Sequence, residues 1–343
     1  MGITKNGGIR PLAVIVPLIL SIAGFVLAMI ALFAGSGSQQ QALEDYHLIA
    51  INMSDFGHNL IPTSTSSGSE PTSTSSIWDD IEGAITDELN DIIGDVADKL
   101  SQELGISQWY SLHVMTACEG NFAPNATSQG AWYNTTNCTA QSPGVHFNLT
   151  AVIQKELDQG PLKLNASSIP IPDKIQEAID YLNSFLLATF VLFVLGAGFS
   201  GLSILSCIAV LVLALLRHNN SNNPINAAVA AANIVLAALA TLALALASAI
   251  ATAISKKGVK EINDAGDEAG ISAVQGSKLM VVSWVAFAVM LVATAFWGLA
   301  CWIARRNRGR VVVMADGEKR TRTRTRGSGE SGRGLLGIFR RRR

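Results

Sequence analysis

Seventeen consecutive residues, Gly105–Asn121 (GISQWYSLHVMTACEGN), gather side chains of the types used in catalysis and metal binding. They include His113, Cys118 and Glu119. Imidazole, thiolate and carboxylate groups act as bases, nucleophiles and metal ligands. The same residue types, with an aromatic pair beside them, also hold small extracellular domains together. The stretch alone leaves a reactive and a structural site open, so the elements around it must decide.

Long apolar runs dominate the rest of the chain. Of the 343 residues, 49% are hydrophobic and only 15% are charged, whereas about a quarter is charged in soluble proteins. A helix needs about 20 apolar residues to cross a bilayer. The composition therefore predicts a mainly α membrane protein, a bundle of four transmembrane helices with a large first extracellular loop. We place these helices at 11–34, 185–216, 225–255 and 279–304.

Basic flanks set the expected topology, because lysine and arginine mark the cytoplasmic side. Lys5 and Arg10 precede the first apolar run, Arg217 follows the second, and four arginines closely follow the fourth. We therefore predict a multi-pass membrane protein with both termini in the cytoplasm. Its cytoplasmic segments would be 1–10, 217–224 and 305–343, and its extracellular segments 35–184 and 256–278.

The first apolar run has a second interpretation, a cleaved signal peptide. Its apolar core is longer than the 7–15 residues, roughly, of a signal peptide, and Leu32-Phe33-Ala34 is a poor cleavage site. We expect an uncleaved anchor. Cleavage would leave three spans and the same outer loop.

The charge is distributed very unevenly. Residues 35–184 hold 19 acids and 4 bases, a net of −15, and residues 305–343 hold 14 bases and 3 acids, a net of +11. The short outer segment carries four lysines, which oppose its assignment, and four acids, which offset them. This difference in net charge between the two segments bears on the environment that each segment contacts, and not on the fold.

Glycosylation sequons agree with the outside assignment of the long loop, because N-linked acceptors are expected on extracellular surfaces. Asn134 and Asn137 are so close that we expect incomplete modification of the pair. Asn219 lies in the predicted cytoplasmic turn, so we expect this sequon to remain unglycosylated. The six acceptors in the long loop are Asn52, Asn125, Asn134, Asn137, Asn148 and Asn165.

Composition divides the long loop into three parts. Residues 63–76 are almost entirely serine and threonine and predict a flexible linker. Residues 77–104 place apolar side chains every three or four positions, which predicts an acidic amphipathic helix. A calcium site on this helix is the sharper alternative, but no D-x-D-x-D-G loop supports it. Residues 105–140 hold the aromatic and cysteine motif.

Cys118 and Cys138 are the two cysteines of the long loop. In an oxidising compartment the simplest expectation is one disulfide. Zinc would need further ligands, and only two histidines lie nearby. Residues 109–114 alternate and are rich in β-formers, which predicts a short strand. Trp132 and Tyr133 are expected to pair with it in a small β-unit clamped by the disulfide.

The motif LGISQWYSLHVMTACEG resembles the extracellular signature of the fungal cortical-patch (eisosome) tetraspan family, which includes the PalI regulators of the ambient-pH response. That family is similar in plan to the claudins, and the resemblance of topology covers about residues 11–306. It implies an extracellular aromatic and cysteine motif with no catalytic role. The matching positions are Gly105, Trp109, Tyr110, Ser111, His113, Cys118, Glu119, Gly120 and Cys138.

The predicted spans contain no acid, base or histidine. Because such residues mark ion and proton pathways, a coupled transporter is disfavoured and a passive pore stays open. Asn233 is the most deeply placed polar residue of the third span, and we expect it to form an interhelical hydrogen bond. No nucleotide-binding, triad or zinc-hydrolase pattern occurs, so we expect neither an enzyme nor a cofactor or metal site.

The tail is expected to adhere to anionic lipids of the inner leaflet, at about 1 kcal/mol per base. A solvated tail is the plainer alternative. The expected contacts are Arg320, Arg322, Arg324, Arg326, Leu335, Leu336, Phe339, Arg340, Arg341, Arg342 and Arg343.

Three functions remain in order of preference. The first is a non-enzymatic scaffold that organises the plasma membrane at the cell cortex. Its partners would be lipids, further copies or other cortical membrane proteins, and the cell wall, with no nucleic acid. The second, which the resemblance allows, is a sensor in ambient-pH signalling, with His113 and His146 as the groups that titrate near neutrality. The third is a channel or transporter subunit.

Overall fold

The computed structural model describes residues 11–35, 41–54, 106–124, 126, 130–159, 173–216, 227–267 and 270–330. Several predicted features lie outside these residues. They are the linker 63–76, the acidic helix 77–104, Gly105, the sequons at Asn125 and Asn165, and the end of the tail from 331.

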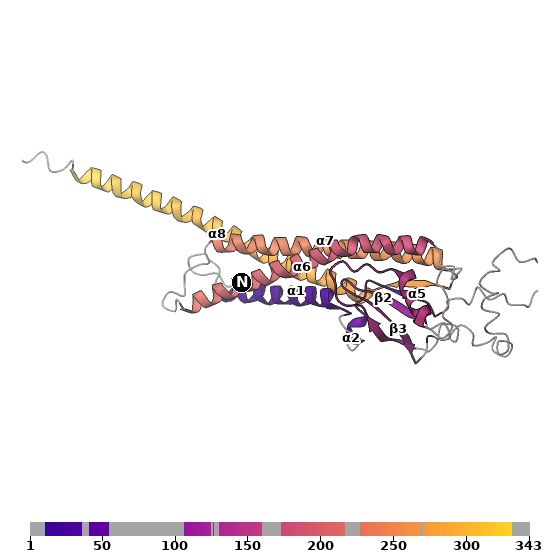
Figure 1. Ribbon diagram of the computed structural model, residues 1–343. Helices are drawn as coiled ribbons and strands as arrows, with labels where there is room; N and C mark the ends of the chain where they lie inside the picture. Colours follow the sequence, from indigo (N-terminus) through magenta and orange to yellow (C-terminus); the bar gives the residue numbers. More distant parts are fainter. Residues whose placement is uncertain are drawn as a thin grey trace, which may run out of the picture. The chain divides into compact units, whose positions relative to one another are not determined.

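Four helices are long enough and apolar enough to cross a membrane. This confirms the four predicted spans. The first, α1 (Ile15–Phe33), follows a short 3-10 helix, η1 (Pro11–Val14). The others are α6 (Asp173–Leu216), α7 (Ala227–Gly266) and α8 (Ser277–Glu330) (Figure 1).

Helices α6 and α7 extend well beyond the apolar runs. The second apolar run begins at residue 185, but the structure has one continuous helix from Asp173. Ile175, Ile179 and Leu182 on this extension are fully buried. Helix α7 likewise continues to Gly266, into the segment predicted as a loop. Ile262 on the α7 extension is fully buried as well, and Gly258 lies against Ile49 and Leu182, so packing of apolar side chains explains both extensions.

A five-stranded antiparallel sheet joins segments from both predicted outer loops, in the order β4-β3-β2-β1-β5. Sequence analysis expected Trp132 and Tyr133 to pair with the strand at 109–114. That pairing is wrong, because β3 lies between them, and β1 and β5 were not predicted. The strands are β1 (Ile49–Asn52), β2 (Trp109–Leu112), β3 (Ala117–Ala123), β4 (Trp132–Cys138) and β5 (Ser272–Gln275).

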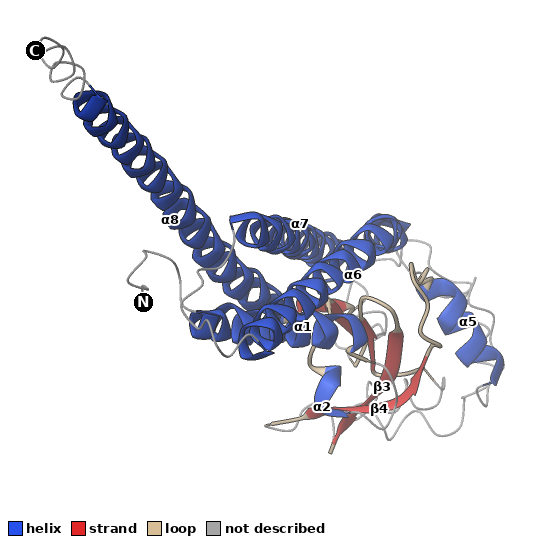
Figure 2. Ribbon diagram, turned by 90° about the vertical axis from the view of Figure 1, so that its left-hand side faces the viewer, coloured by secondary structure: helices blue, strands red, loops and turns tan. Residues whose placement is uncertain are grey.

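The register divides the sheet residues between two faces, because directly paired residues point to the same side. Trp109 and Ser111 share one face with their partners Gly120 and Cys118. The short helix α2 (Gln41–Glu44) supplies Glu44 to this face. Tyr110 lies on the other face, where α5 (Leu149–Gln159) supplies Glu156. In Figure 2, α2 and α5 lie on different sides of β3 and β4.

The chain divides into two compact units, each described by itself. The sheet unit comprises Ile22–Gly201 and Leu239–Met290. The second unit comprises Met1–Ser21, Leu202–Ala238 and Leu291–Arg343.

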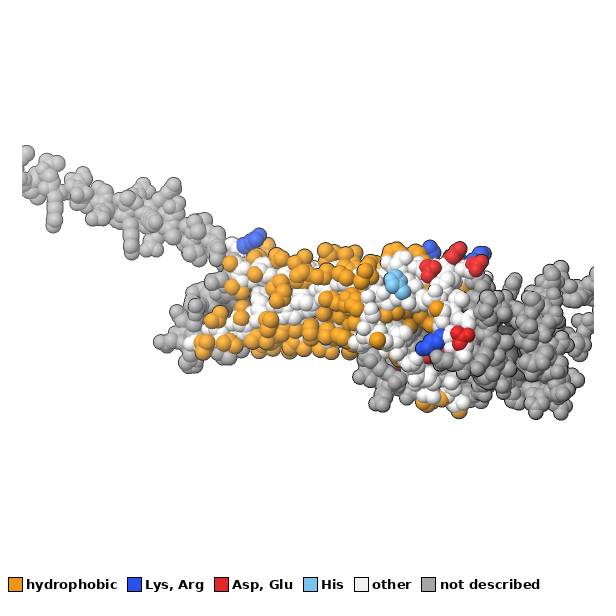
Figure 3. Space-filling view, viewed as in Figure 1, with side chains coloured by type: hydrophobic (Ala, Val, Ile, Leu, Met, Phe, Trp, Pro, Cys, Tyr) orange, Lys and Arg blue, Asp and Glu red, His pale blue; other side chains and the backbone are white. Residues whose placement is uncertain are grey.

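Within the sheet unit the four helices form a closed bundle. Gly24 of α1 faces Met290 of α8, and Gly196 of α6 faces Leu244 of α7. Phe25 of α1 lies against α6, and Thr252 of α7 contacts α8 through Met280. On the face shown in Figure 3, hydrophobic side chains cover the helices and charged side chains gather where the sheet lies.

Within the second unit, Ser21 of α1 and Ser203 of α6 share a hydrogen bond of 3.1 Å. The Asn233 amide donates to Val229 O of its own helix at 3.0 Å. Its Oδ1 is buried and has no hydrogen-bond partner among the residues that the structure describes. The hydrogen bond that Asn233 makes is therefore intrahelical, where an interhelical one was predicted.

Candidate functional site

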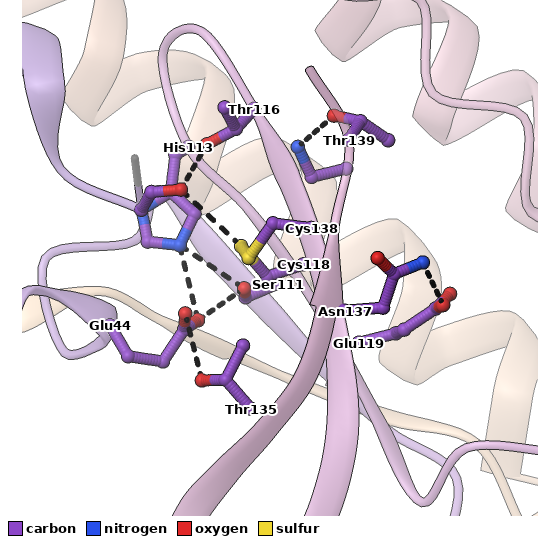
Figure 4. Close-up of a disulfide and its surroundings, with 12 residues drawn as sticks. Glu44, Ser111, His113, Thr116, Cys118, Glu119, Thr135, Asn137, Cys138 and Thr139 are labelled. Carbon is purple, nitrogen blue, oxygen red and sulfur yellow. Dashed lines mark hydrogen bonds and ion pairs between the residues drawn. A yellow bond between two sulfur atoms is a disulfide. The ribbon is translucent and has the colours of Figure 1, made fainter. Parts of the chain in front are cut away.

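A buried polar cluster lies beneath the first face of the sheet (Figure 4). It combines Ser111 of β2 and His113, which follows that strand, with Glu44 of α2. The disulfide between Cys118 and Cys138 lies beside it, with an S–S distance of 2.05 Å. The disulfide predicted from the sequence is therefore present, and it joins β3 to the edge strand β4.

His113 is fully buried, and both its ring nitrogens face oxygen acceptors. Nε2 lies 3.1 Å from Glu44 Oε1 and 3.2 Å from Ser111 Oγ. Nδ1 lies 3.3 Å from the carbonyl oxygen of Tyr46. A neutral imidazole donates from only one nitrogen, whereas an imidazolium donates from both. A neutral ring at His113 would therefore leave either the Glu44 carboxylate or the Tyr46 carbonyl without an N–H from it.

The pKa of Glu44 reflects two opposing influences. Burial favours the neutral acid and would raise the pKa, but hydrogen bonding and charge attraction from His113 and a hydrogen bond from Ser111 outweigh it. The net pKa is lower than the usual 4.5. Glu44 is therefore held as a carboxylate although it is only 3% exposed.

His47 forms a second buried imidazole next to the pair. Its Nδ1 lies 2.9 Å from the carbonyl oxygen of Glu44. Its ring packs edge-to-face against the Tyr133 ring, with 5.6 Å between the two ring centroids. Burial lowers the pKa of His47 below the usual 6.5, and the neighbouring acceptors only partly oppose this. His47 is thus favoured as a neutral ring.

The cluster does not have the connectivity of a hydrolytic triad. In a triad the nucleophile and the carboxylate lie at opposite nitrogens of the imidazole. Here Ser111 and Glu44 both lie at Nε2 of His113, so the carboxylate cannot orient the ring for proton transfer from the serine. A Glu44 oxygen and the two cysteine sulfurs lie within 4.8 Å of one another, but sulfurs committed to a disulfide supply no thiolate to a metal.

Most residues of the sequence motif are packing residues of the sheet. Trp109, Tyr110, Ser111 and His113 are each at most 1% exposed. Glu119 is partly exposed and accepts a hydrogen bond of 2.9 Å from the Asn137 amide. The sequence thus indicated the strand correctly, and the structure brings Ser111 and His113 together but leaves Glu119 on the other face of the sheet.

The family follows from a comparison with protein-family models. The SUR7/PalI family model matches residues 13–296, which covers the bundle and the sheet. This chain belongs to the SUR7/PalI family. It is accordingly a membrane protein, in agreement with its four apolar helices. No curated protein and no solved structure matches this chain significantly.

The partners Glu44, Tyr46 and His47 of this SUR7/PalI protein were not predicted as site residues. The only signal in the sequence is a polar run, Glu44 to His47, shortly after the first apolar run. Their placement depends on contacts with residues more than sixty positions away. Such contacts leave no local pattern.

Two glycines next to helix ends, Gly35 after α1 and Gly276 before α8, pack closely against the cluster. Gly35 follows α1 with a φ of +73°, and a Cβ there would lie 2.5 Å from the His113 ring. Gly276 precedes α8, donates to Leu48 O at 3.1 Å and lies against the His47 carbonyl. The ends of the first and fourth spans therefore contact the two histidine-bearing segments.

Gly276→Ala is expected to destabilise the sheet unit by about 1–3 kcal/mol, as overpacking does. A Cβ at Gly276 would lie 1.6 Å from the backbone oxygen of His47. The backbone next to the paired strands β1 and β5 must therefore shift. The apparent melting temperature of the purified full-length protein is the measurement. Gly198→Ala is the matched control, because a Cβ there meets nothing within 4 Å. Equal melting of both variants would contradict the prediction.

The second face carries a smaller polar group around Glu156. This carboxylate accepts hydrogen bonds from the hydroxyls of Tyr110 and Ser107, the latter at 2.8 Å. Burial raises the pKa of Glu156, and these hydrogen bonds only partly offset it. Burial and the nearby Glu156 raise the pKa of Tyr110 as well. Helix α5 is thereby anchored to β2.

Proposed function

We propose that this SUR7/PalI protein is a non-enzymatic organiser of the plasma membrane at the cell cortex, in membrane domains of the eisosome type. Both termini would lie in the cytoplasm, and the sheet would face the cell wall. The observation that supports this best is that every span is connected directly to one small domain.

Each of the four helices contacts, or leads directly into, the extracellular part of the sheet unit, which consists of the five-stranded sheet with α2 and α5. Gly35 after α1 contacts His113, and Asn183 of α6 exchanges two hydrogen bonds with the Phe147 backbone, at 3.0 and 2.8 Å. Asn263 of α7 exchanges two with Ala273 of β5, and β5 leads directly into α8. A domain tied to all four spans would keep the bundle in one arrangement and present one outer surface to neighbours.

The expected partners are lipids, further copies of the chain, other cortical membrane proteins and the cell wall. Large apolar side chains such as Val281 and Leu205 are more than 60% exposed on the helices, as contact with lipid or another helix requires. Arg320 to Arg326 lie on the helical backbone of α8, and the expected lipid contacts from Leu335 onward lie outside the described residues.

Live imaging of a tagged full-length chain tests the proposal. An organiser is expected to form stable cortical patches whose fluorescence recovers slowly after bleaching. A diffuse or endosomal distribution would refute it. Binding of the tail peptide to anionic and to neutral liposomes tests the lipid contact separately, and equal binding to both would exclude adhesion through charge.

The outward orientation predicts which sequons carry glycans. Asn134, Asn137 and Asn148 are exposed. Asn52 lies in β1 between two strands, and its Oδ1 accepts from the Ser54 amide at 2.9 Å. We expect a glycan at Asn148, incomplete modification of the neighbouring pair Asn134 and Asn137, and less at Asn52, which is only partly exposed in the sheet. Glycopeptide mass spectrometry measures each occupancy, and empty sites throughout would contradict the orientation.

A second candidate function is sensing of ambient pH, and the His113–Glu44 pair is the observation in its favour. A neutral imidazole can give an N–H to only one of its two acceptors, Glu44 and the Tyr46 carbonyl, whereas an imidazolium gives one to each. Gly35 lies against the same ring, so the change would reach the end of α1. His113→Gln is expected to abolish the alkaline response while patches persist. An unchanged response would exclude His113 as the sensor.

A further inference from the structure

A cavity of about 420 Å³ lies on the second face of the sheet, between β3, β4 and α5. Tyr110 and Phe147 form part of its lining and are almost fully buried. Its other walls are mostly polar and include hydroxyl, amide, ammonium and carboxylate groups. These come from Ser107, Thr136, Thr139, Asn137, Lys155, Glu119 and Glu156.

We propose that this cavity is a saccharide-binding site that holds one pyranose ring. A pyranose presents several hydroxyls that both donate and accept, and the lining offers both kinds of partner. The carboxylates of Glu119 and Glu156 accept from Asn137 and Ser107, which fixes them as acceptors at the walls. One ammonium beside two carboxylates gives no excess of positive charge for an anionic ligand.

Asn137 suggests one source of the sugar, an N-linked glycan of this chain. It lines the cavity and is the acceptor of the sequon Asn137-Cys138-Thr139. A glycosylated asparagine keeps one N–H, so the 2.9 Å hydrogen bond to Glu119 can remain while the first N-acetylglucosamine lies over the lining. This source depends on the proposed outward orientation. A free glycan of the surroundings is the other source of the same chemistry.

The first arm tests the attached sugar in the full-length protein from a eukaryotic host, trimmed so that one N-acetylglucosamine stays on each asparagine. Asn137→Gln is expected to lower the apparent melting temperature by about 2–4 °C. Asn134→Gln is the matched control, because Asn134 is an exposed sequon of the same strand outside the cavity lining. Protein from tunicamycin-treated cells should show no difference between these variants.

The second arm tests a free sugar, with chitotriose as the probe and Asn137→Gln protein in detergent. A saturable rise of the melting temperature supports the site. Val152→Phe and Thr136→Tyr fill the cavity from α5 and from β4, and each should remove both the rise and the effect of Asn137→Gln.

The two arms separate the possible failures. Empty sequons with a chitotriose response refute the outward orientation and keep the cavity site. Occupied sequons with equal melting of both asparagine variants, and no chitotriose response, overturn the saccharide site and leave the orientation standing.

Discussion

Replacing Glu44 with alanine is expected to lower the free energy of unfolding by about 3–5 kcal/mol. The substitution removes the partner of an imidazole that is fully buried and has acceptors at both nitrogens. It also takes away the acceptor of the Ser111 hydroxyl. A buried charge without its partner costs far more than the pair contributes. The measurement is thermal unfolding of the purified full-length protein near neutral pH.

Asp45→Ala is the matched control for Glu44→Ala. Asp45 is the next residue and pairs with Lys278, but its side chain is 42% exposed. Exposed pairs contribute about 0–1 kcal/mol. The double variant Glu44→Gln/His113→Gln removes both charges and should recover part of the loss, because neither partner is then left alone. If Glu44→Ala and Asp45→Ala melt alike, the cluster does not hold the unit together.

Two residues of the cluster, Glu44 and His47, also determine how stability depends on pH. The pKa of Glu44 is lowered in the fold, so its contribution is present above the unfolded value of 4.5 and is lost as pH falls through the folded value. The pKa of His47 is also lowered, so protonation of the unfolded chain already costs stability below 6.5. The wild-type protein should therefore lose stability as the pH falls below 6.5. In Glu44→Gln the part of this loss at the lowest pH should disappear.

The spans and the motif strand were predictable because their signals are local. An uncharged run of apolar residues indicates a membrane helix whatever its neighbours do. The strand Trp109–Leu112 was visible in the alternation of its own residues. The extension of α6 was visible only in part. Its apolar run begins only at residue 185, and the side chain of Asn183, just before that run, bonds to the Phe147 backbone.

The other elements depend on partners that are distant in sequence. β1 and β5 have four residues each and pair with one another across more than two hundred positions. No alternation of apolar and polar residues and no aromatic β-former marks these two segments, whose sequences are IAIN and SAVQ. Glu44 follows the same logic, because its helix has only four residues and its role appears only when β2 places Ser111 and His113 beside it. In the candidate site, Ser111 and His113 thus come from the sequence motif, whereas Glu44 joins them only through tertiary contacts.

Replacing Cys118 and Cys138 with serine is expected to cost about 3 kcal/mol, the loop-closure entropy of the intervening chain. The two residues are twenty positions apart and face each other across β3 and β4. Since β4 is the edge strand of the sheet, it has β3 as its single neighbouring strand. Its amides should therefore exchange hydrogen faster in the variant, whereas those of the central β2 should change less.

The control for the cysteine variant is Cys301→Ala, which removes a buried cysteine that forms no disulfide. Reducing agent should lower the melting temperature of the wild type and of Cys301→Ala, and should leave the double serine variant unchanged. The single variants Cys118→Ser and Cys138→Ser should each lose as much as the double one, because either substitution opens the same loop. A double variant that melts and exchanges like the wild type would show that strand pairing and the Glu44–His113 contact alone hold β4 in place.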